Sequence, residues 1–173
     1  NEKSRAVYHL FFYKLHYYHQ HTGMKGAFKE LSLMYTEPTA NAVIRLEKIK
    51  YFLDAAEIDS IEQDIVEMYR AFTSLSPAYQ LLLLRHLAVY YYSRWDFPKA
   101  ISCARDVFSQ KNVMFEPKIY WGLMETIVRS YAYMNDFKRG EKYASYMRKK
   151  ALATNEDQWI ALSYYTSSYV PYR

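Results

Sequence analysis

The chain has 173 residues, 51% hydrophobic and 24% charged, a composition that is typical of a globular protein and excludes a disordered one. Only 4 Gly and 5 Pro leave little room for a turn-rich β architecture, whereas 20 Tyr suit helix pairs that bury each ring and keep its hydroxyl near water. The 23 Lys and Arg exceed the 18 Asp and Glu by a modest +5, which does not by itself indicate a nucleic-acid binder.

Neither a membrane span nor a signal peptide is predicted. Arg, His or Lys interrupts each apolar run before the roughly 18 residues that a span needs, and residues 1–10 lack an apolar core and a cleavage site. A single cysteine, Cys103, cannot form an internal disulfide and favours a reducing compartment, so we expect a cytoplasmic location. The chain begins inside an expected helix and ends partway through a repeat, so we expect a piece of a longer protein.

Helical periodicity predicts a series of antiparallel helix pairs that form one domain over residues 1–173. In chain order, the expected hairpins span 8–35, 45–72, 81–108 and 121–148, and the first helix of another follows at 159–169. Prolines at positions 38, 77 and 117 lie 39 and 40 residues apart, each just before a helical stretch. Proline fits the first turn of a helix because that turn leaves its amide hydrogen unpaired.

An internal repeat accompanies these prolines. Tyr51, Tyr91 and Tyr131 lie 40 residues apart, and residues 87–100 align without a gap on residues 127–140. Such a period is the mark of a stacked repeat architecture. We therefore expect the three tyrosines in equivalent places on successive first helices, each wedged between helices.

The expected packing positions are large on the first helices and small on the second helices. Small residues let two helices approach closely, and Cys103 fits among them as a small core residue. The first helices of two hairpins supply Leu84, Leu87, Ala88, Tyr91, Met124, Ile127, Val128 and Tyr131, and the second helices supply Ala100, Ala104, Val107, Gly140, Ala144 and Met147.

This pattern resembles the tetratricopeptide repeat, a helix-turn-helix unit. The residues that carry the resemblance are Leu84, Leu87, Ala88, Tyr91, Phe97, Ala100 and Ala104. The period is nearer 40 than the family's roughly 34, and the glycine before the turn is absent. The resemblance implies a right-handed α-solenoid of about four and a half hairpins that binds a protein or peptide. Lengthened repeats of this kind look like those of bacterial regulators and sensors, which implies a role in transcription regulation or signalling.

In such arrays the first helices line the concave surface, so their exposed side chains form the expected ligand groove. The candidate groove residues are Arg45, Phe52, Arg85, Tyr92, Glu125, Arg129 and Tyr133, with Ser163 and Ser167 on the last helix. Guanidinium groups could hold a carboxylate, and neighbouring rings could grip apolar side chains, so the expected ligand is acidic. The alternative for Arg45 and Arg85 is pairing with local acids such as Glu47 or Asp54.

Two other classes of function stay open. A nucleic-acid-binding helical repeat would use the basic stretch Lys138, Arg139, Lys142 and Arg148 to Lys150, which falls on an expected second helix. A structural dimerisation domain would use exposed aromatic residues such as Trp95 or Tyr146.

We expect no enzyme, metal or cofactor. The glycines at 23, 26, 122 and 140 form no phosphate loop, and no nucleophile lies beside a base. His9, His16, His19 and His21 gather near one helix, but no Cys or acid accompanies them at zinc-ligand spacing, so packing is the favoured interpretation.

Overall fold

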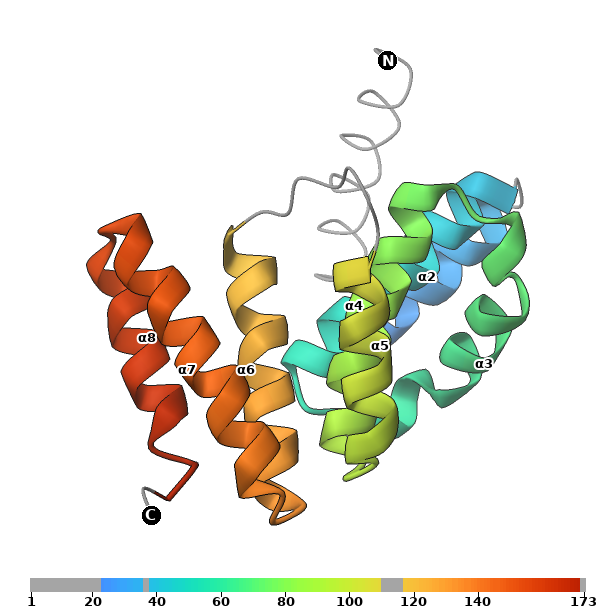
Figure 1. Cartoon of the computed structure of the whole chain (residues 1–173). Coiled ribbons are helices and arrows are strands. Elements are labelled where there is room, and N and C mark those ends of the chain that lie inside the picture. The colour runs from blue at the N-terminus through green and yellow to red at the C-terminus, as the bar shows by residue number, and fades with distance from the viewer. Residues whose placement is uncertain (1–22, 36–37, 110–116, 172–173) are drawn as a thin grey trace. The chain divides into compact units, whose positions relative to one another are not determined.

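The computed structural model describes residues 23–35, 38–109 and 117–171, and over these ranges the protein is all-α, without a strand (Figure 1). This confirms the all-α part of the predicted fold, whereas the solenoid arrangement and the number of hairpins stay predictions. A helix at residues 23–34 comes first. The labelled elements then follow in the order α2 (Pro38–Asp54), η1 (Ile58–Ile61), α3 (Glu62–Arg70), η2 (Phe72–Ser74), α4 (Pro77–Ser93), α5 (Phe97–Ser109), α6 (Pro117–Tyr133), α7 (Phe137–Thr154) and α8 (Asp157–Ser167). The expected helix at 8–20 lies outside the described residues.

The chain divides into two compact units, Asn1–Tyr79 and Gln80–Arg173, and each is described by itself. A single continuous domain over 1–173 stays a prediction. None of the helices in the described ranges combines the length and the apolar character that a bilayer crossing requires.

The proline spacing predicted the helix starts correctly. Pro38, Pro77 and Pro117 are the first residues of α2, α4 and α6, and Pro98 is the second residue of α5. Each ring fixes a helical φ where no intrahelical hydrogen bond is lost.

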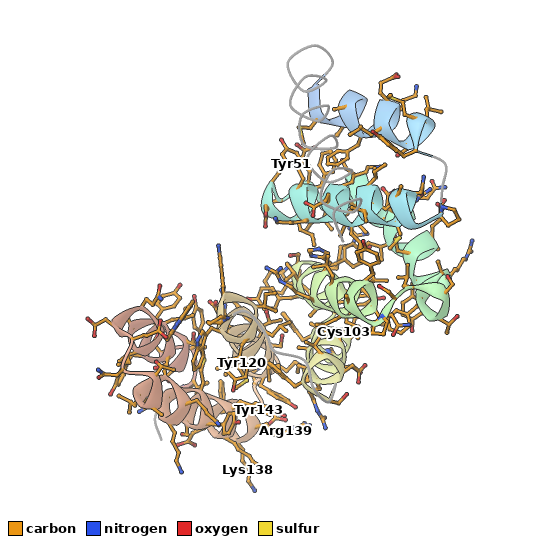
Figure 2. The ribbon with its side chains drawn as sticks, turned by 90° about the horizontal axis from the view of Figure 1, so that it is seen from above. Tyr51, Cys103, Tyr120, Lys138, Arg139 and Tyr143 are labelled. Atoms are coloured by element: carbon orange, nitrogen blue, oxygen red, sulfur yellow. The ribbon has the colours of Figure 1, made fainter. Side chains whose placement is uncertain are left out.

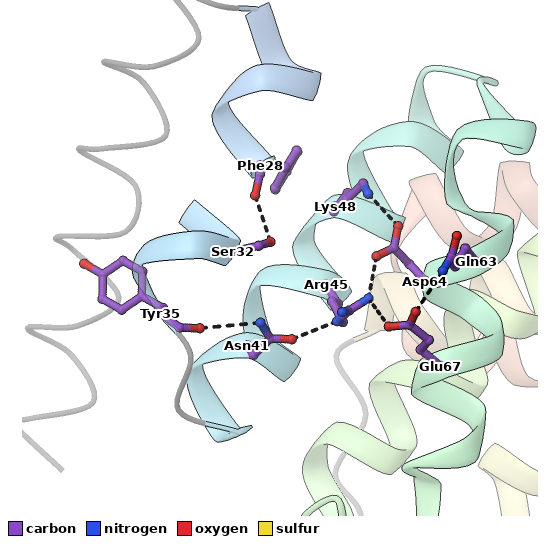
Figure 3. Close-up of polar contacts among 9 residues, drawn as sticks. All are labelled: Phe28, Ser32, Tyr35, Asn41, Arg45, Lys48, Gln63, Asp64 and Glu67. Carbon is purple, nitrogen blue, oxygen red and sulfur yellow. Dashed lines mark hydrogen bonds and ion pairs between the residues drawn. The ribbon is translucent and has the colours of Figure 1, made fainter. Parts of the chain in front are cut away.

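In the first unit, α2 is held on two sides. The ring of Phe28, from the helix at residues 23–34, lies 6.1 Å from the ring of Phe52. On another side Asp64 of α3 accepts a hydrogen bond from Arg45 at 2.9 Å and pairs with Lys48 at 2.6 Å (Figure 3). Asp64 is buried, and removing one partner of a buried ion pair costs about 3–5 kcal/mol, so this network joins α2 to α3.

In the second unit, α6, α7 and α8 pack side by side (Figure 1). All but one of the predicted packing positions on the four helices α4 to α7 are buried, and Tyr91 is half-buried. The predicted close approach is clearest at Gly140, where an added Cβ would lie 3.2 Å from Val170 Cγ2 and 3.5 Å from Tyr131 Cβ.

One turn geometry recurs after α2, α4 and α6. In each turn a residue in the left-handed region, Ala56 (φ 59°), Trp95 (φ 62°) or Asn135 (φ 57°), follows the helix. The next amide donates back over five residues, from Asp96 to the Tyr91 carbonyl and from Asp136 to the Tyr131 carbonyl, both at 2.9 Å. This is the Schellman ending, which satisfies carbonyls that a helix end leaves unpaired.

The last two of these turns match in their side chains as well. Asp96 and Asp136 each accept from the amide three residues on, at 3.3 and 3.1 Å. Lys99 pairs with Asp96 and lies 5.2 Å from the Tyr91 ring, and Arg139 repeats both contacts with Asp136 and, at 5.0 Å, with the Tyr131 ring. The alignment of 87–100 on 127–140 is therefore repeated in three dimensions.

The first of the three turns corrects the register of the tyrosine spacing. The Glu57 amide donates to the carbonyl of Phe52 at 2.9 Å, so Phe52 occupies the place of Tyr91 and Tyr131. Tyr51 is one residue out of step and 38% exposed, although its ring contacts the Phe52 ring at 5.1 Å. The hairpin around α2 is one residue shorter than the period of 40 implies.

Candidate functional site

Four of the seven predicted groove residues meet in the second unit: Tyr92 of α4 and Glu125, Arg129 and Tyr133 of α6. The Arg129 guanidinium lies 5.3 Å from the Tyr92 ring and pairs with Glu125 at 3.1 Å. The Tyr92 and Tyr133 rings are 6.2 Å apart. A further ring, Tyr169, lies 4.6 Å from the same guanidinium, so the cation is held between two tyrosines.

Further rings extend this cluster on both sides. Tyr133 stacks on Phe97 at 5.4 Å and 9°, and Trp95 lies 5.7 Å from Tyr133. On the other side, Tyr165 and Tyr169 share a hydrogen bond of 2.7 Å between their hydroxyls. We call Tyr92, Trp95, Phe97, Tyr133, Tyr165 and Tyr169, together with Arg129, the aromatic band.

Burial and contacts within the aromatic band shift the pKa values of Tyr92 and Arg129. Burial, reinforced by Tyr133 and opposed by Arg129, raises the pKa of Tyr92 to about 12. Burial works against the charge of Arg129, yet hydrogen bonding to Tyr133 and the neighbouring rings raise its pKa. At neutral pH Tyr92 is therefore neutral, and Arg129 is a cation that pairs with Glu125.

Trp95 is the outermost member of the band. It is 71% exposed and lies in the left-handed region, which bulky residues rarely adopt, whereas Asn135 fills the equivalent place in the next turn. Backbone strain of this kind concentrates at functional sites. A large exposed ring at a strained position is consistent with a surface for a partner.

The exposed side chains of α4, α6 and α8 follow one register. On α6 one stripe of exposed or half-buried positions runs along the helix, and the same positions, 40 residues earlier and later, are also exposed or half-buried on α4 and α8. The three stripes comprise Leu82, Arg85, Val89 and Tyr92 on α4, Lys118, Gly122, Glu125, Arg129 and Tyr133 on α6, and Gln158, Leu162, Tyr165 and Tyr169 on and just after α8. We call their union the first-helix face.

The structure corrects the predicted residues of the last helix. Ser163 and Ser167 are buried, at 0% and 4% exposure, and their hydroxyls donate to carbonyls of their own helix. Instead of these serines, Tyr165 and Tyr169 lie on the first-helix face. The repeat could have identified them, because they follow Glu125 and Arg129 by 40 residues.

The predicted residues of the first unit are not free to bind a ligand. Phe52 is 1% exposed and packs on Phe28, so we correct its assignment to the groove: it is a core residue. Arg45 pairs with Asp64 at 2.9 Å and Glu67 at 2.7 Å, which fits the alternative of local pairing, with other acids than those expected (Figure 3). A groove shared by Arg45 and Arg129 would span both units and stays a prediction.

Arg85 differs from the other two arginines. It is half-exposed and makes no hydrogen bond or ion pair with the described residues. Its guanidinium is the uncompensated cation among the predicted groove arginines.

The first unit also contains an open cleft of about 640 Å³ beside Arg45. Its wall includes Pro38, Glu67, Met68 and Tyr79, and its charged side chains are already paired with one another. It therefore has no free charge to select a ligand.

The basic stretch lies on α7, outside the first-helix face, and Figure 2 shows Lys138 pointing away from the ribbon. Arg139 is paired with Asp136, Arg148 donates to Ser167 at 3.3 Å, and Lys150 lies 5.8 Å from the Tyr146 ring. The most basic helix is thus partly engaged in contacts with its own unit.

The described residues lack the features of a metal site and of a reactive thiol. In the described ranges no three His, Cys, Asp or Glu side chains gather as metal ligands, and His9, His16, His19 and His21 lie outside these ranges. Burial raises the pKa of the half-buried Cys103 thiol to about 11, so it stays protonated near neutral pH.

No protein-family model, curated protein or solved structure matches this chain.

Proposed function

We propose that this chain is a peptide- or protein-binding module that holds its partner on the first-helix face. The observation that carries the proposal is the common register of the three stripes, which aligns rings across α4, α6 and α8 beside Arg85 and Lys118, two cations without an ion pair among the described residues. Tyrosine and tryptophan offer large contact area at low entropic cost, which is why they are enriched where proteins bind partners.

The charge on this face favours an acidic partner. The first-helix face carries three positive charges, on Arg85, Lys118 and Arg129, and a single negative charge, on Glu125. Arg85 and Lys118 form no ion pair within the described ranges, so a ligand carboxylate would meet a cation without breaking an existing bridge.

The proposal also includes the arrangement of the helix hairpins. We infer a right-handed α-solenoid of the tetratricopeptide type, on the support of the repeated turns and the repeated packing residues. By the same resemblance, the chain would serve a larger bacterial regulatory or signalling protein in the cytoplasm. Curvature changes passed along neighbouring hairpins would then report the captured partner.

The test compares binding of a synthetic peptide library by the wild-type chain, Arg85→Ala and Arg105→Ala. Arg105 is an exposed arginine of α5, on a second helix, and serves as the matched control. Acidic peptides should bind wild type and Arg105→Ala alike. Arg85→Ala should weaken them by about 1.5–3 kcal/mol, the range for a hydrogen bond to a charged group, with an unchanged melting temperature.

Other outcomes would favour the rival classes. Equal binding by Arg85→Ala would remove Arg85 from the site. A preference for nucleic acid that falls steeply with salt would point to the basic helix α7. A stable dimer in sedimentation, lost on changing Trp95 and accompanied by no peptide binding, would favour the dimerisation domain.

A further inference from the structure

Gly122 is an open position in the middle of the first-helix face. It lies in α6, is exposed, and a Cβ added there would meet no atom within 4 Å. The equivalent positions on α4 and α8 carry Leu82 and Leu162. At this position of the repeat, α4 and α8 therefore carry a leucine side chain, whereas α6 carries no side chain.

No contact among the described residues requires glycine at this position, because an added Cβ would have room. Gly140 shows the contrast, because there a Cβ would press on Val170 at 3.2 Å. Glycine inside a helix is also less stable than alanine, since it has more backbone freedom to lose on folding. Gly122 thus weakens α6 without relieving any contact in the described structure.

We propose that Gly122 keeps space open for an apolar side chain of the bound peptide, and so determines which residue the ligand presents there. This inference rests on the proposed function and adds a specificity position to it. The partner is a peptide in which a bulky apolar residue adjoins an acidic one.

The spacing on the face supports that pairing. Gly122 and Glu125 lie one helical turn apart on α6, about 5 Å along the axis, and Arg85 occupies on α4 the place that Glu125 has on α6. An apolar side chain over Gly122 would therefore lie within one or two residues of a carboxylate at Arg85. The net positive charge of the face supplies the complementarity to such a ligand.

The probes are short synthetic peptides that differ only in the residue next to a glutamate, which is leucine, phenylalanine or alanine. Wild type should bind the leucine or phenylalanine probe about ten times more tightly than the alanine probe, since each CH₂ removed from water contributes about fourfold and an open face buries only part of the larger side chain. Gly122→Leu should reduce this ratio to near one. The control Ser145→Leu, which adds a leucine to the exposed side of α7, should keep it.

A stability measurement separates this role from a structural one. Gly122→Ala should raise the melting temperature, because alanine is the better helix former and has room, while it lowers the leucine-to-alanine ratio. A lower melting temperature would show that α6 needs the glycine for itself and would overturn the inference.

The two proposals fail in different ways. If no probe binds wild type, the proposed function fails and the role of Gly122 fails with it. If the probes bind, Arg85→Ala weakens them, and Gly122→Leu leaves the ratio unchanged, only the role of Gly122 is overturned.

Discussion

Replacing Trp95 with asparagine would test whether its exposed ring serves the fold or a partner. The change gives the turn between α4 and α5 the residue that Asn135 provides between α6 and α7. Both residues have φ near 60°, a region that asparagine adopts more readily than tryptophan. Hydrogen bonds of the turn run through the backbone, so they are kept.

The expected change in the free energy of unfolding is small, because two effects oppose each other. The left-handed conformation costs an ordinary residue about 1–2 kcal/mol, part of which asparagine recovers. The lost contacts of Trp95 with Phe97 at 5.8 Å and Tyr133 at 5.7 Å are worth about 0.5–1.5 kcal/mol each, toward the lower end because the ring is 71% exposed. The net change should lie within about 1 kcal/mol of zero.

A buried tryptophan provides the comparison. Trp121 is 4% exposed, stacks on Trp159 at 5.9 Å and contacts Tyr120 edge-on at 4.9 Å. Its replacement by alanine should cost about 3–5 kcal/mol.

Urea unfolding of the full chain and both variants would measure these differences through the midpoint, provided that the slope stays constant. A loss above about 2 kcal/mol for Trp95→Asn would mean that the ring is needed by the fold. The exposure and backbone strain of Trp95 would then not indicate a partner.

Ala100→Trp should cost about 1–3 kcal/mol or more, because Ala100 is 0% exposed in a close helix contact; an unchanged melting temperature would contradict that packing. Asp136→Asn should destabilise the protein near neutral pH and progressively less in acid. The hydrogen bonds from Arg139 hold the pKa of Asp136 below its ordinary value, so its stabilisation is present above about pH 4 and is lost as the pH falls through the lower folded-state pKa. Melting temperatures of wild type and Asp136→Asn along a pH series should converge at the acid end, and a constant gap would show that the carboxylate charge contributes nothing.

The sequence predicted the fold where the repeat is complete. Between α4 and α7, the identity of the residues at fixed intervals predicted the buried face and the position of the turns, whereas the paired contacts of Asp96 and Asp136 appear only in the structure. Periodicity alone was less informative around α2, because this helix is buried on several sides. A spacing of 40 residues before Tyr91 predicted Tyr51 as the packing residue. The hairpin is one residue shorter, however, and places Phe52 in the core.

The site was predictable in part for the same reason. Tyr92, Glu125, Arg129 and Tyr133 lie together because α4 and α6 repeat the same open stripe. The compensation of Arg45 by Asp64 and Glu67 could not be inferred, since those acids come from a helix that packs across α2. The sequence predicted that Trp95 is exposed, but not the strain of its backbone, because the left-handed conformation appears only in the folded turn.

The recurring turn also provides equivalent points at which one repeat could be removed or added. Asp96-Phe97 and Asp136-Phe137 are the same dipeptide in the same conformation, each closing a ring of hydrogen bonds to a tyrosine carbonyl. Removing the 40 residues 97–136 would join Asp96 directly to Phe137 and keep the Asp-Phe dipeptide, with Trp95 before it and Lys138 after it. Gene duplication or unequal recombination at this point could thus lengthen or shorten the protein by one repeat while keeping this turn, and each such event would add or delete one stripe of the first-helix face.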